Sequence, residues 1–382
     1  MSVNTISQVF SSLPDPRKKR RSDRHYPLIE ILTISICAVI AGCNNCVAIA
    51  EFGRCKQRFF ASFLPLEHGI PSHDTFNDVL NRLNPNEFSK AFTQWVCRLG
   101  ELKDDIVALD GKVMRRTWDK SNGIGAIHLV SAWSTQNNMC FAQVKVADKS
   151  NEVTAIPKLL ELLDIKGATI TTDAMGCQTQ IAEQIIQRDA EFIFALKGNQ
   201  GRLHKDIKVY FAKSINDNLE GVTAGLDHFT EIDQSHGRAV FRKVWVTSDM
   251  ATLHQAHPKW TSVNTIIAVD CGRLHEGKLS YERRFYISSH ENKNAEYFAQ
   301  AIRSHWHVEN KLHWHLDVSF DEDQNRHRSG YAAENISLIN KTALNLLKNE
   351  TTVKAGIKTK RLKAGWDDDY MLKVLMVGFT TD

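Results

Sequence analysis

Ile106-Val-Ala-Leu-Asp110-Gly111 and Ala168-Thr-Ile-Thr-Thr-Asp173 are the two stretches that decide the fold. Each is a short run of apolar and β-branched residues, which predicts a buried strand with an aspartate at its end. Further strands are expected at Ala126–Ser134, Met139–Ala147 and Glu191–Leu196, and helices at Val153–Leu163 and Gly176–Gln187. Strands that alternate with helices in this way predict a layered α/β core, which we place at residues 101–200.

Upstream of this core, residues 1–100 are predicted to be helical and to form a separate, DNA-binding domain. Leu28–Ala41 and Ser72–Leu83 have helical patterns. Asn84 can cap the next helix, Pro85 suits its first position, and Glu87 can complete a capping box. Strand patterns are scarce here, which separates this stretch from the core.

Downstream of the core, residues 201–280 are predicted to form a β-rich insertion, and residues 281–350 to return to the core. The insertion is expected to contain strands at Phe229–Asp233, Val240–Thr247 and Val263–Val269. The returning segment is expected to contain a strand at Tyr281–Ser288, a long helix at Ala295–Leu316 and a second helix at Ala332–Leu347. Residues 351–382 are a tail with a basic patch at Lys354–Lys363.

Composition indicates a globular protein of two or three units, because 42% of the 382 residues are hydrophobic. A net charge of only +4 means that nucleic-acid binding has to depend on local basic clusters. Eight cysteines and a polar N-terminus without a signal sequence favour reduced thiols and a cytoplasmic location. Cys43 and Cys46 have the spacing of half a zinc site, but buried helical cysteines are the favoured interpretation. The apolar run Leu28–Gly42 is too short to span a membrane.

Three carboxylates have the context of a metal site. Asp110 and Asp173 follow predicted strands, and Glu309 lies within the predicted long helix. Sites in open α/β sheets gather at the carboxyl ends of strands, and Mg²⁺ favours carboxylates, water and phosphate oxygens. The alternative is that the aspartates cap turns and that Glu309 lies on a solvated face.

Several motifs resemble the H-repeat-associated (Rhs-linked) insertion-sequence transposases of the DDE class. They are Gly69-Ile-Pro-Ser-His-Asp-Thr-Phe76, Ala108-Leu-Asp110-Gly-Lys112, Thr172-Asp173-Ala174, Ala195-Leu-Lys-Gly-Asn-Gln200, Tyr286-Ile-Ser-Ser289 and the run from His305 to Asp323. The resemblance covers roughly residues 5–350, with the motifs in the family's order. It implies an RNase H-like catalytic core with a β-rich insertion before the last acid. In it, Asp110, Asp173 and Glu309 would be the catalytic metal ligands.

The resemblance also implies cofactors and partners. The cofactors would be two Mg²⁺ or Mn²⁺ ions, and the substrate would be double-stranded DNA at the element ends and target. The protein would act as a homodimer or multimer on bacterial nucleoid DNA, by hydrolysis followed by strand transfer. Relatives in the wider group carry a Tyr-x2-Arg-x3-Glu-x6-Lys signature around the glutamate, whereas this chain has Ile302, His305 and Leu316 at the other three positions. The DNA-end contact of that arginine and lysine therefore needs substitutes.

Basic and polar residues near these motifs are candidates for DNA contact, although basic runs are often merely solvated. The candidates are Arg17, Lys18, Lys19, Arg20, Arg21, Lys112, Arg115, Arg116, Lys197, Asn199, Arg303, His305 and Lys311. Three of these candidates lie on the predicted long helix that carries Glu309, and they would replace the missing signature residues. They are Arg303, His305 and Lys311. Asn199 could equally belong to a structural turn.

Other interpretations stay open at this point. His305, Glu309 and His313 are spaced to bind zinc from one helix, and the acids Asp317, Asp321, Glu322 and Asp323 could supply the third ligand instead of Glu309. Trp306 and Trp314 are expected in the core, with base stacking as the alternative. A nuclease that cuts without joining, or an inactive DNA-binding relative, could share the same three acids.

Overall fold

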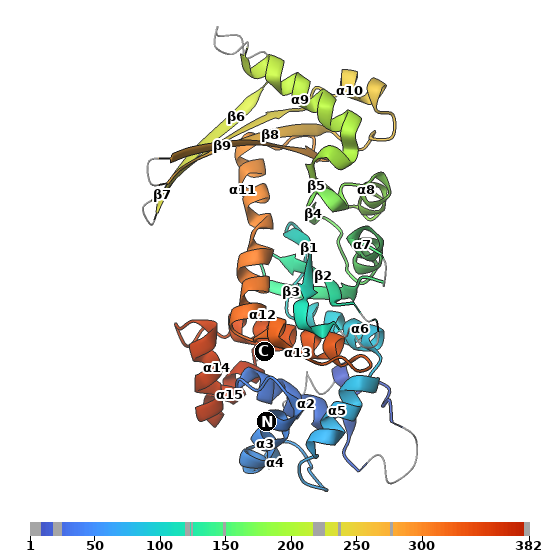
Figure 1. Ribbon diagram of the computed structural model, residues 1–382, viewed down its shortest axis with the longest axis vertical. Coiled ribbons are helices and arrows are strands. Elements are labelled where there is room, and N and C mark those ends of the chain that lie inside the picture. The colour runs from blue at the N-terminus through green and yellow to red at the C-terminus, as the bar shows by residue number, and fades with distance from the viewer. Residues whose placement is uncertain are drawn as a thin grey trace.

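The computed structural model describes residues 9–17, 25–118, 123, 125–147, 150–216, 226–235, 238–275 and 278–377. Lys18, Lys19, Arg20 and Arg21 of the predicted basic arm lie outside the described residues. The molecule is elongated, with the N-terminal helices at one end and the strands of the predicted insertion at the other (Figure 1). The fold is mixed α/β, as the sequence predicts.

One mixed sheet of nine strands runs through the molecule in the order β3-β2-β1-β4-β5-β9-β8-β7-β6. The strands are β1 (Ile106–Met114), β2 (Ile127–Ser134), β3 (Met139–Lys145), β4 (Thr169–Thr172), β5 (Glu191–Leu196), β6 (Asp227–Ser235), β7 (Arg238–Thr247), β8 (Thr265–His275) and β9 (Lys278–Ser288). Strands β1, β4 and β5 are parallel, and all other neighbours are antiparallel. The strands predicted in the core are all present.

Strand β1 does not end at Asp110, contrary to the prediction. It continues to Met114 because its antiparallel partner β2 keeps pairing with it, from Asp110↔Ser131 to Met114↔Ile127. Its parallel partner β4, in contrast, pairs only as far as Leu109↔Thr172. Asp110 therefore lies in mid-strand, at the level where β4 ends and the chain turns at Asp173.

The predicted insertion extends the core sheet and forms no sheet of its own. Its strands β6, β7 and β8 form an antiparallel meander with β9, the strand predicted to return to the core, and β9 pairs with β5 from Ile193↔Ser288 to Leu196↔Phe285. Two helices accompany the strands, α9 (Gly201–Asn216) and α10 (Ala251–Ala256), at the far end of the molecule (Figure 1). The insertion is thus joined rigidly to the core through continuous backbone hydrogen bonds.

Helices α7 (Glu152–Glu161) and α8 (Thr179–Ile186) lie to one side of the core strands, and α11 (Ala295–His305) lies to the other (Figure 1). Helix α11 contacts β1 and β4 of the core and also β6 and β7 of the insertion. Successive side chains of a strand point to opposite faces. Asp110 therefore faces α11 and its continuation, while position 111 faces α7.

The predicted long helix Ala295–Leu316 is interrupted. After α11, a π-helical turn, η6, runs from Val308 to His313, and α12 (Trp314–Val318) follows. A π turn contains an extra residue per turn and is frequent at functional sites. Glu309 lies within this turn, so its side chain is placed by a local irregularity that helical periodicity does not predict.

The N-terminal and C-terminal helices share one apolar core with the sheet. The N-terminal helices are α2 (Leu28–Ile40), α3 (Cys46–Cys55), α4 (Gln57–Ala61), α5 (His73–Arg82) and α6 (Pro85–Val96). Helix α13 (Ala332–Asn349) packs between them and β3, and its Asn335 donates to the carbonyls of Leu80 and Leu83. The predicted tail forms two packed helices, α14 (Ile357–Trp366) and α15 (Asp368–Leu375). The domain boundaries given above stay a prediction.

Local signals at the N-terminal helices are mostly confirmed. Asn84 caps α6 by accepting from the N–H of Asn86, with Pro85 in the first position, but Glu87 pairs with Lys90 and forms no capping box.

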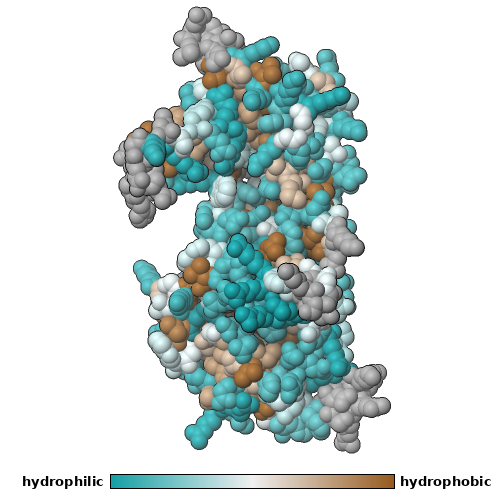
Figure 2. All heavy atoms as spheres, viewed as in Figure 1, coloured by the Kyte–Doolittle hydropathy of each residue, from teal (hydrophilic) through white to brown (hydrophobic). Residues whose placement is uncertain are grey.

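In the tail, Lys360 and Arg361 are buried, so the predicted basic patch is only partly exposed. The face shown in Figure 2 is mainly hydrophilic, with small separate hydrophobic patches. Across the described chain, every helix is too short or too polar to cross a lipid bilayer.

Candidate active site

The three predicted acids line one cavity of about 530 Å³ between the sheet and the helix that carries Glu309. Asp110 comes from the middle of β1, Asp173 from the end of β4, and Glu309 from the π turn. Leu109 of β1 pairs with Thr172 of the neighbouring parallel strand β4. Asp110 and Asp173 are the residues that follow these two in the chain, so they lie side by side at the end of β4. This size is typical of small-ligand sites, which are usually few in a protein.

Asp110 and Glu309 meet at a histidine. His313 Nδ1 lies 3.5 Å from Asp110 Oδ2 and 3.4 Å from Glu309 Oε2. One ligand atom from each of the three residues can be chosen so that all lie within 4.8 Å of one another, and no other such group occurs among the described residues. Asp173 shares the cavity but does not belong to this close group. The zinc interpretation of the cysteine pair therefore finds no three-ligand group around Cys43 or Cys46.

Burial and mutual repulsion perturb the acids. Burial, and then the charges of Glu309 and Glu152, raise the pKa of Asp110 to about 8. The hydrogen bond from His313 lowers the pKa of Glu309, whose side chain is 51% exposed against 16% for Asp110. Burial and the charge of Glu152 also raise the pKa of Asp173. Strongly perturbed carboxyl groups in a cavity are a mark of functional sites.

Asp173 is held in place by the turn that follows it. Its Oδ1 accepts from the N–H of Met175 at 2.9 Å and of Gly176 at 3.3 Å, so it caps the short helix η3 (Ala174–Gly176). Asn199, predicted as a DNA contact or a structural turn residue, donates to the carbonyl of Ala174 at 2.5 Å. This contact favours the structural interpretation of Asn199, because it joins the loop after β5 to the loop after β4.

His305 does not behave as a replacement for a DNA-binding arginine. Its Nδ1 lies 2.9 Å from the hydroxyl of Thr171 on β4, and burial lowers its pKa to about 4. A neutral, hydrogen-bonded imidazole cannot supply the charge that a phosphate attracts. His305 instead fixes the end of α11 to the sheet directly before the π turn. His305 is absent from the close group of Asp110, Glu309 and His313. His305, Glu309 and His313 therefore do not form the three-ligand zinc site that was considered as an alternative.

Lys112 is also committed internally. Its Nζ lies 2.7 Å from Asp317, 3.3 Å from Glu322 and 3.2 Å from Asp323, and its side chain is only 9% exposed. Three of the four acids that were considered as rivals of Glu309, all except Asp321, are therefore engaged by a lysine. Arg115, in contrast, is 81% exposed, with one contact to Asp323 at 3.4 Å.

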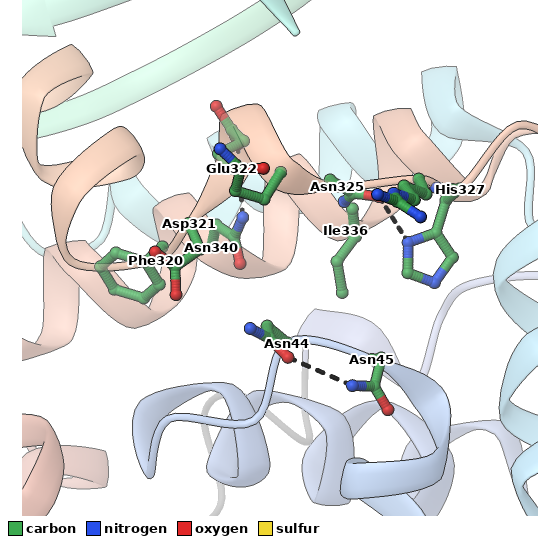
Figure 3. A pocket seen from close by; sticks show the side chains of 11 residues that line it. Asn44, Asn45, Phe320, Asp321, Glu322, Asn325, His327, Ile336 and Asn340 are labelled. Carbon is green, nitrogen blue, oxygen red and sulfur yellow. Dashed lines mark hydrogen bonds between the residues drawn. The ribbon is translucent and has the colours of Figure 1, made fainter. Parts of the chain in front are cut away.

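Glu322 anchors this acidic segment in the interior. Figure 3 shows it beside Asn340, which donates to Glu322 Oε1 at 3.3 Å, in a second cavity that also contains Asn44 and Asn45. Its side chain is 0% exposed and lies between the charges of Lys341 and Lys112. The segment after α12 is thus a structural link between β1 and α13, and it does not line the cavity of Asp110.

The remaining basic candidates differ in exposure. Arg17 is buried by a bidentate pair with Asp15 and a bond to the carbonyl of Tyr26, so it is unsuited to DNA contact. Arg303 is half exposed but pairs with Glu231 and Asp233 of β6. Exposed or half-buried side chains at the other described positions are those of Arg116, Lys197 and Lys311. Only Lys197 lines the cavity with the three acids.

Sequence reasoning misplaced two tryptophans. Trp306 and Trp314 were expected in the core, but they are 50% and 53% exposed. The two tryptophans are exceptions, because other apolar residues of this helical segment, such as Ile302, Leu312 and Leu316, are buried. Trp306 lines the cavity, and the guanidinium of Arg284 lies 5.8 Å from its ring centre.

Four further residues of the site were not predicted as such. Arg283 and Arg284 of β9 line the cavity, His313 joins Asp110 to Glu309, and Glu152 at the start of α7 lies close to both aspartates. The spacing of His313 from Glu309 was visible in the sequence as i, i+4. Nothing in the sequence pattern of Glu152 distinguishes it from an ordinary first-turn acid.

The mixed sheet and its covering helix bring carboxylates from distant segments of the chain into one cavity, and such oxygen ligands suit a divalent metal ion. The family profiles agree: residues 101–346 match the transposase DDE domain, and residues 7–96 match the domain associated with it. The chain belongs to the DDE transposase family.

Two of the similar proteins are named as putative transposases. The "H repeat-associated putative transposase YhhI" of Escherichia coli K12 is 40% identical over 98% of both chains. The "Putative transposase YncI" of Escherichia coli O157:H7 is 38% identical over 100% of this chain and 98% of its own. A solved piggyBac transposase synaptic complex with hairpin DNA aligns with 97% of this chain and 76% of that chain, at a TM-score of 0.45 and 10% identity.

Proposed function

We propose that this transposase cleaves DNA at the ends of its element and joins them to target DNA, with Asp110, Asp173 and Glu309 as the catalytic acids. The observation that carries the proposal is the convergence of Asp110 and Glu309 on His313 within a cavity that Asp173 also lines. Three elements that are far apart in sequence supply these acids. Membership of the DDE family supports the same assignment.

The five strands β3-β2-β1-β4-β5 are the proposed RNase H-like catalytic core, and β6–β9 with α9 and α10 are the proposed insertion. The proposal is supported by the strand order, with an antiparallel β3-β2-β1 meander followed by parallel β4 and β5. The insertion precedes Glu309 in sequence, as the family resemblance implies. Its continuity with β5 places Arg283 and Arg284 opposite the acids.

The donor set suits divalent cations such as Mg²⁺ or Mn²⁺, and we propose two of them. Buried carboxylates that repel one another, as the raised pKa of Asp110 reflects, are relieved by a cation. The Nε2 of His313, buried within the described structure, has no hydrogen-bond partner there. Divalent ions held by these acids assist attack on phosphorus by water or a 3′-hydroxyl and offset charge on the departing oxygen.

The protein's own residues would position the substrate and the acids. Thr171 and His305 fix the Glu309 helix, and the turn at Met175 and Gly176 fixes Asp173. Lys197 would supply positive charge to the DNA phosphates along the cavity wall, where Arg283 and Arg284 are paired with Asp270 and Glu282. A homodimer or multimer that pairs two ends on DNA remains our proposal for the assembly.

The test uses purified Asp110→Asn, Asp173→Asn and Glu309→Gln variants and linear DNA that carries the element ends. Each variant should lose Mg²⁺-dependent cleavage by about three orders of magnitude or more, while circular dichroism stays native. The matched control Glu183→Gln, an exposed carboxylate on α8, should cut normally. Normal cutting by any of the three variants removes that residue from the site. Strand-transfer products on a target plasmid separate a transposase from a nuclease that only cuts.

A further inference from the structure

A fourth carboxylate lies beside the two aspartates, on the α7 side of the sheet. Glu152 is the first residue of α7, and its side chain is only 12% exposed. Its Oε1 lies 2.9 Å from His128 Nε2 of β2. This pair sits directly against Gly111, the residue that follows Asp110 in β1.

Gly111 makes room for this carboxylate. A Cβ atom at position 111 would lie 2.0 Å from Glu152 Oε1 and 2.5 Å from His128 Nε2, distances that atoms cannot adopt without a shift. The sheet therefore has a gap in its side-chain layer next to Asp110, and Glu152 fills it. Any other residue at 111 would push the Glu152 carboxylate away from the strand. The backbone here is ordinary β-strand, so close approach is the reason for a glycine.

Glu152 is also near the second aspartate. Helix α7 packs against η3, the short helix that Asp173 caps. The charge of Glu152 contributes to raising the pKa of Asp110 and the pKa of Asp173, and its carboxylate lies against Gly111, the residue next to Asp110. Placing a third negative charge near two buried aspartates is unfavourable in the absence of a cation. The fold nevertheless builds it there, on the N-terminus of a helix and with a histidine to orient it.

We propose that Glu152 is a fourth acidic residue of the metal site, oriented by His128 and brought to Asp110 and Asp173 by the absence of a side chain at Gly111. It helps to hold a divalent cation between the two aspartates, from the face of the sheet opposite Glu309. The inference rests on the proposed function, which makes the aspartates metal ligands. The alternative is an ordinary structural ion pair between Glu152 and His128.

Direct Mn²⁺ binding to the full-length protein without DNA distinguishes these two roles. Free Mn²⁺ is measured by electron paramagnetic resonance in titrations of the wild type, Glu152→Gln and the control Glu183→Gln. We expect Glu152→Gln to weaken Mn²⁺ binding by about 10-fold or more, as loss of ligand-supporting groups does in metal sites, with no loss of thermal stability in EDTA. An unchanged Mn²⁺ affinity with a lower melting temperature would establish the structural ion pair and overturn the proposal.

Two further variants make the result unambiguous. Gly111→Ala keeps every charged group but displaces the Glu152 carboxylate, so it should weaken Mn²⁺ binding as well. If Glu152→Gln fails to fold, normal Mn²⁺ affinity of Gly111→Ala overturns the proposal by itself. Asp110→Asn tests the underlying site: if it retains Mn²⁺ affinity, the proposed function fails. If it loses affinity while Glu152→Gln retains it, only the role of Glu152 fails.

Discussion

Neutralising Asp110 should make the metal-free protein more stable, and increasingly so as the pH rises. Burial and the neighbouring charges raise the pKa of Asp110 from 3.8 to about 8 in the fold. Because the folded-state pKa lies above the unfolded one, folding favours the protonated form. The wild type therefore loses stability as the pH increases between about 4 and 8, and the loss is complete above that range. Asparagine carries no charge and avoids this loss.

The size of the effect follows from the two pKa values. A rise from 3.8 to about 8 corresponds to about 6 kcal/mol for the ionised carboxylate. Since 16% of the Asp110 side chain is exposed and water can reach it, we expect about half of this value. The free energy of unfolding of Asp110→Asn should accordingly exceed that of the wild type by about 3 kcal/mol near pH 8.5, and by a clearly smaller amount at pH 5.

The assay is urea unfolding in EDTA at pH 5 and pH 8.5, followed by tryptophan fluorescence. Glu183→Gln, an exposed carboxylate on α8, controls for removal of a charge and should track the wild type at both pH values. Adding Mg²⁺ should close the gap at pH 8.5, because only the wild type gains from the ion. Equal stability of Asp110→Asn and wild type at both pH values, or a gap that narrows as the pH rises, would refute the reasoning.

Three other predictions concern the charged residues. Lys112→Met should lower the free energy of unfolding by about 3 kcal/mol, because it removes a partner of the fully buried Glu322. The control Arg115→Met changes a side chain that is 81% exposed, so it should lower the free energy of unfolding by less than about 1 kcal/mol. Both values are measured by the same urea assay. Lys197→Ala should reduce the steepness of the plot of the logarithm of the DNA-binding constant against the logarithm of the salt concentration by about 1. The control Lys158→Ala, at an exposed lysine on α7 that does not line the cavity, should leave this slope unchanged. Replacing Lys18, Lys19, Arg20 and Arg21 together by alanine should flatten that slope by roughly 3, measured by fluorescence anisotropy, and an unchanged slope dismisses the basic arm.

Local patterns in the sequence were sufficient for most of the elements. The strand Glu191–Leu196 matches β5 residue for residue, and Asn84 with Pro85 marks the start of α6. These features depend on residue preference and on hydrogen bonds within a few residues. The two strand-associated aspartates were found for the same reason, since a buried strand next to a turn is visible in any short window.

Tertiary structure decided what lies next to what. The end of β1 depends on how far β2 continues to pair with it, so only the paired sheet places Asp110 in mid-strand. Packing of the helix against β1 brings His313 to Asp110 as well as to Glu309, and the tertiary structure leaves Trp306 and Trp314 half exposed. Basic residues that look alike in sequence divide into buried partners such as Lys112 and exposed ones such as Lys197.

The sequence by itself thus determined the order of elements and the family, and it predicted the three acids that we propose as catalytic. The tertiary structure decided which charged residues form internal ion pairs, that His313 contacts Asp110, and that Glu152, which local patterns do not distinguish, lies beside Gly111. The physical reason is range: strand and helix preferences act over a few neighbouring residues. Coulomb repulsion and hydrogen bonding, in contrast, depend on distances in space that only the packed sheet and helices set.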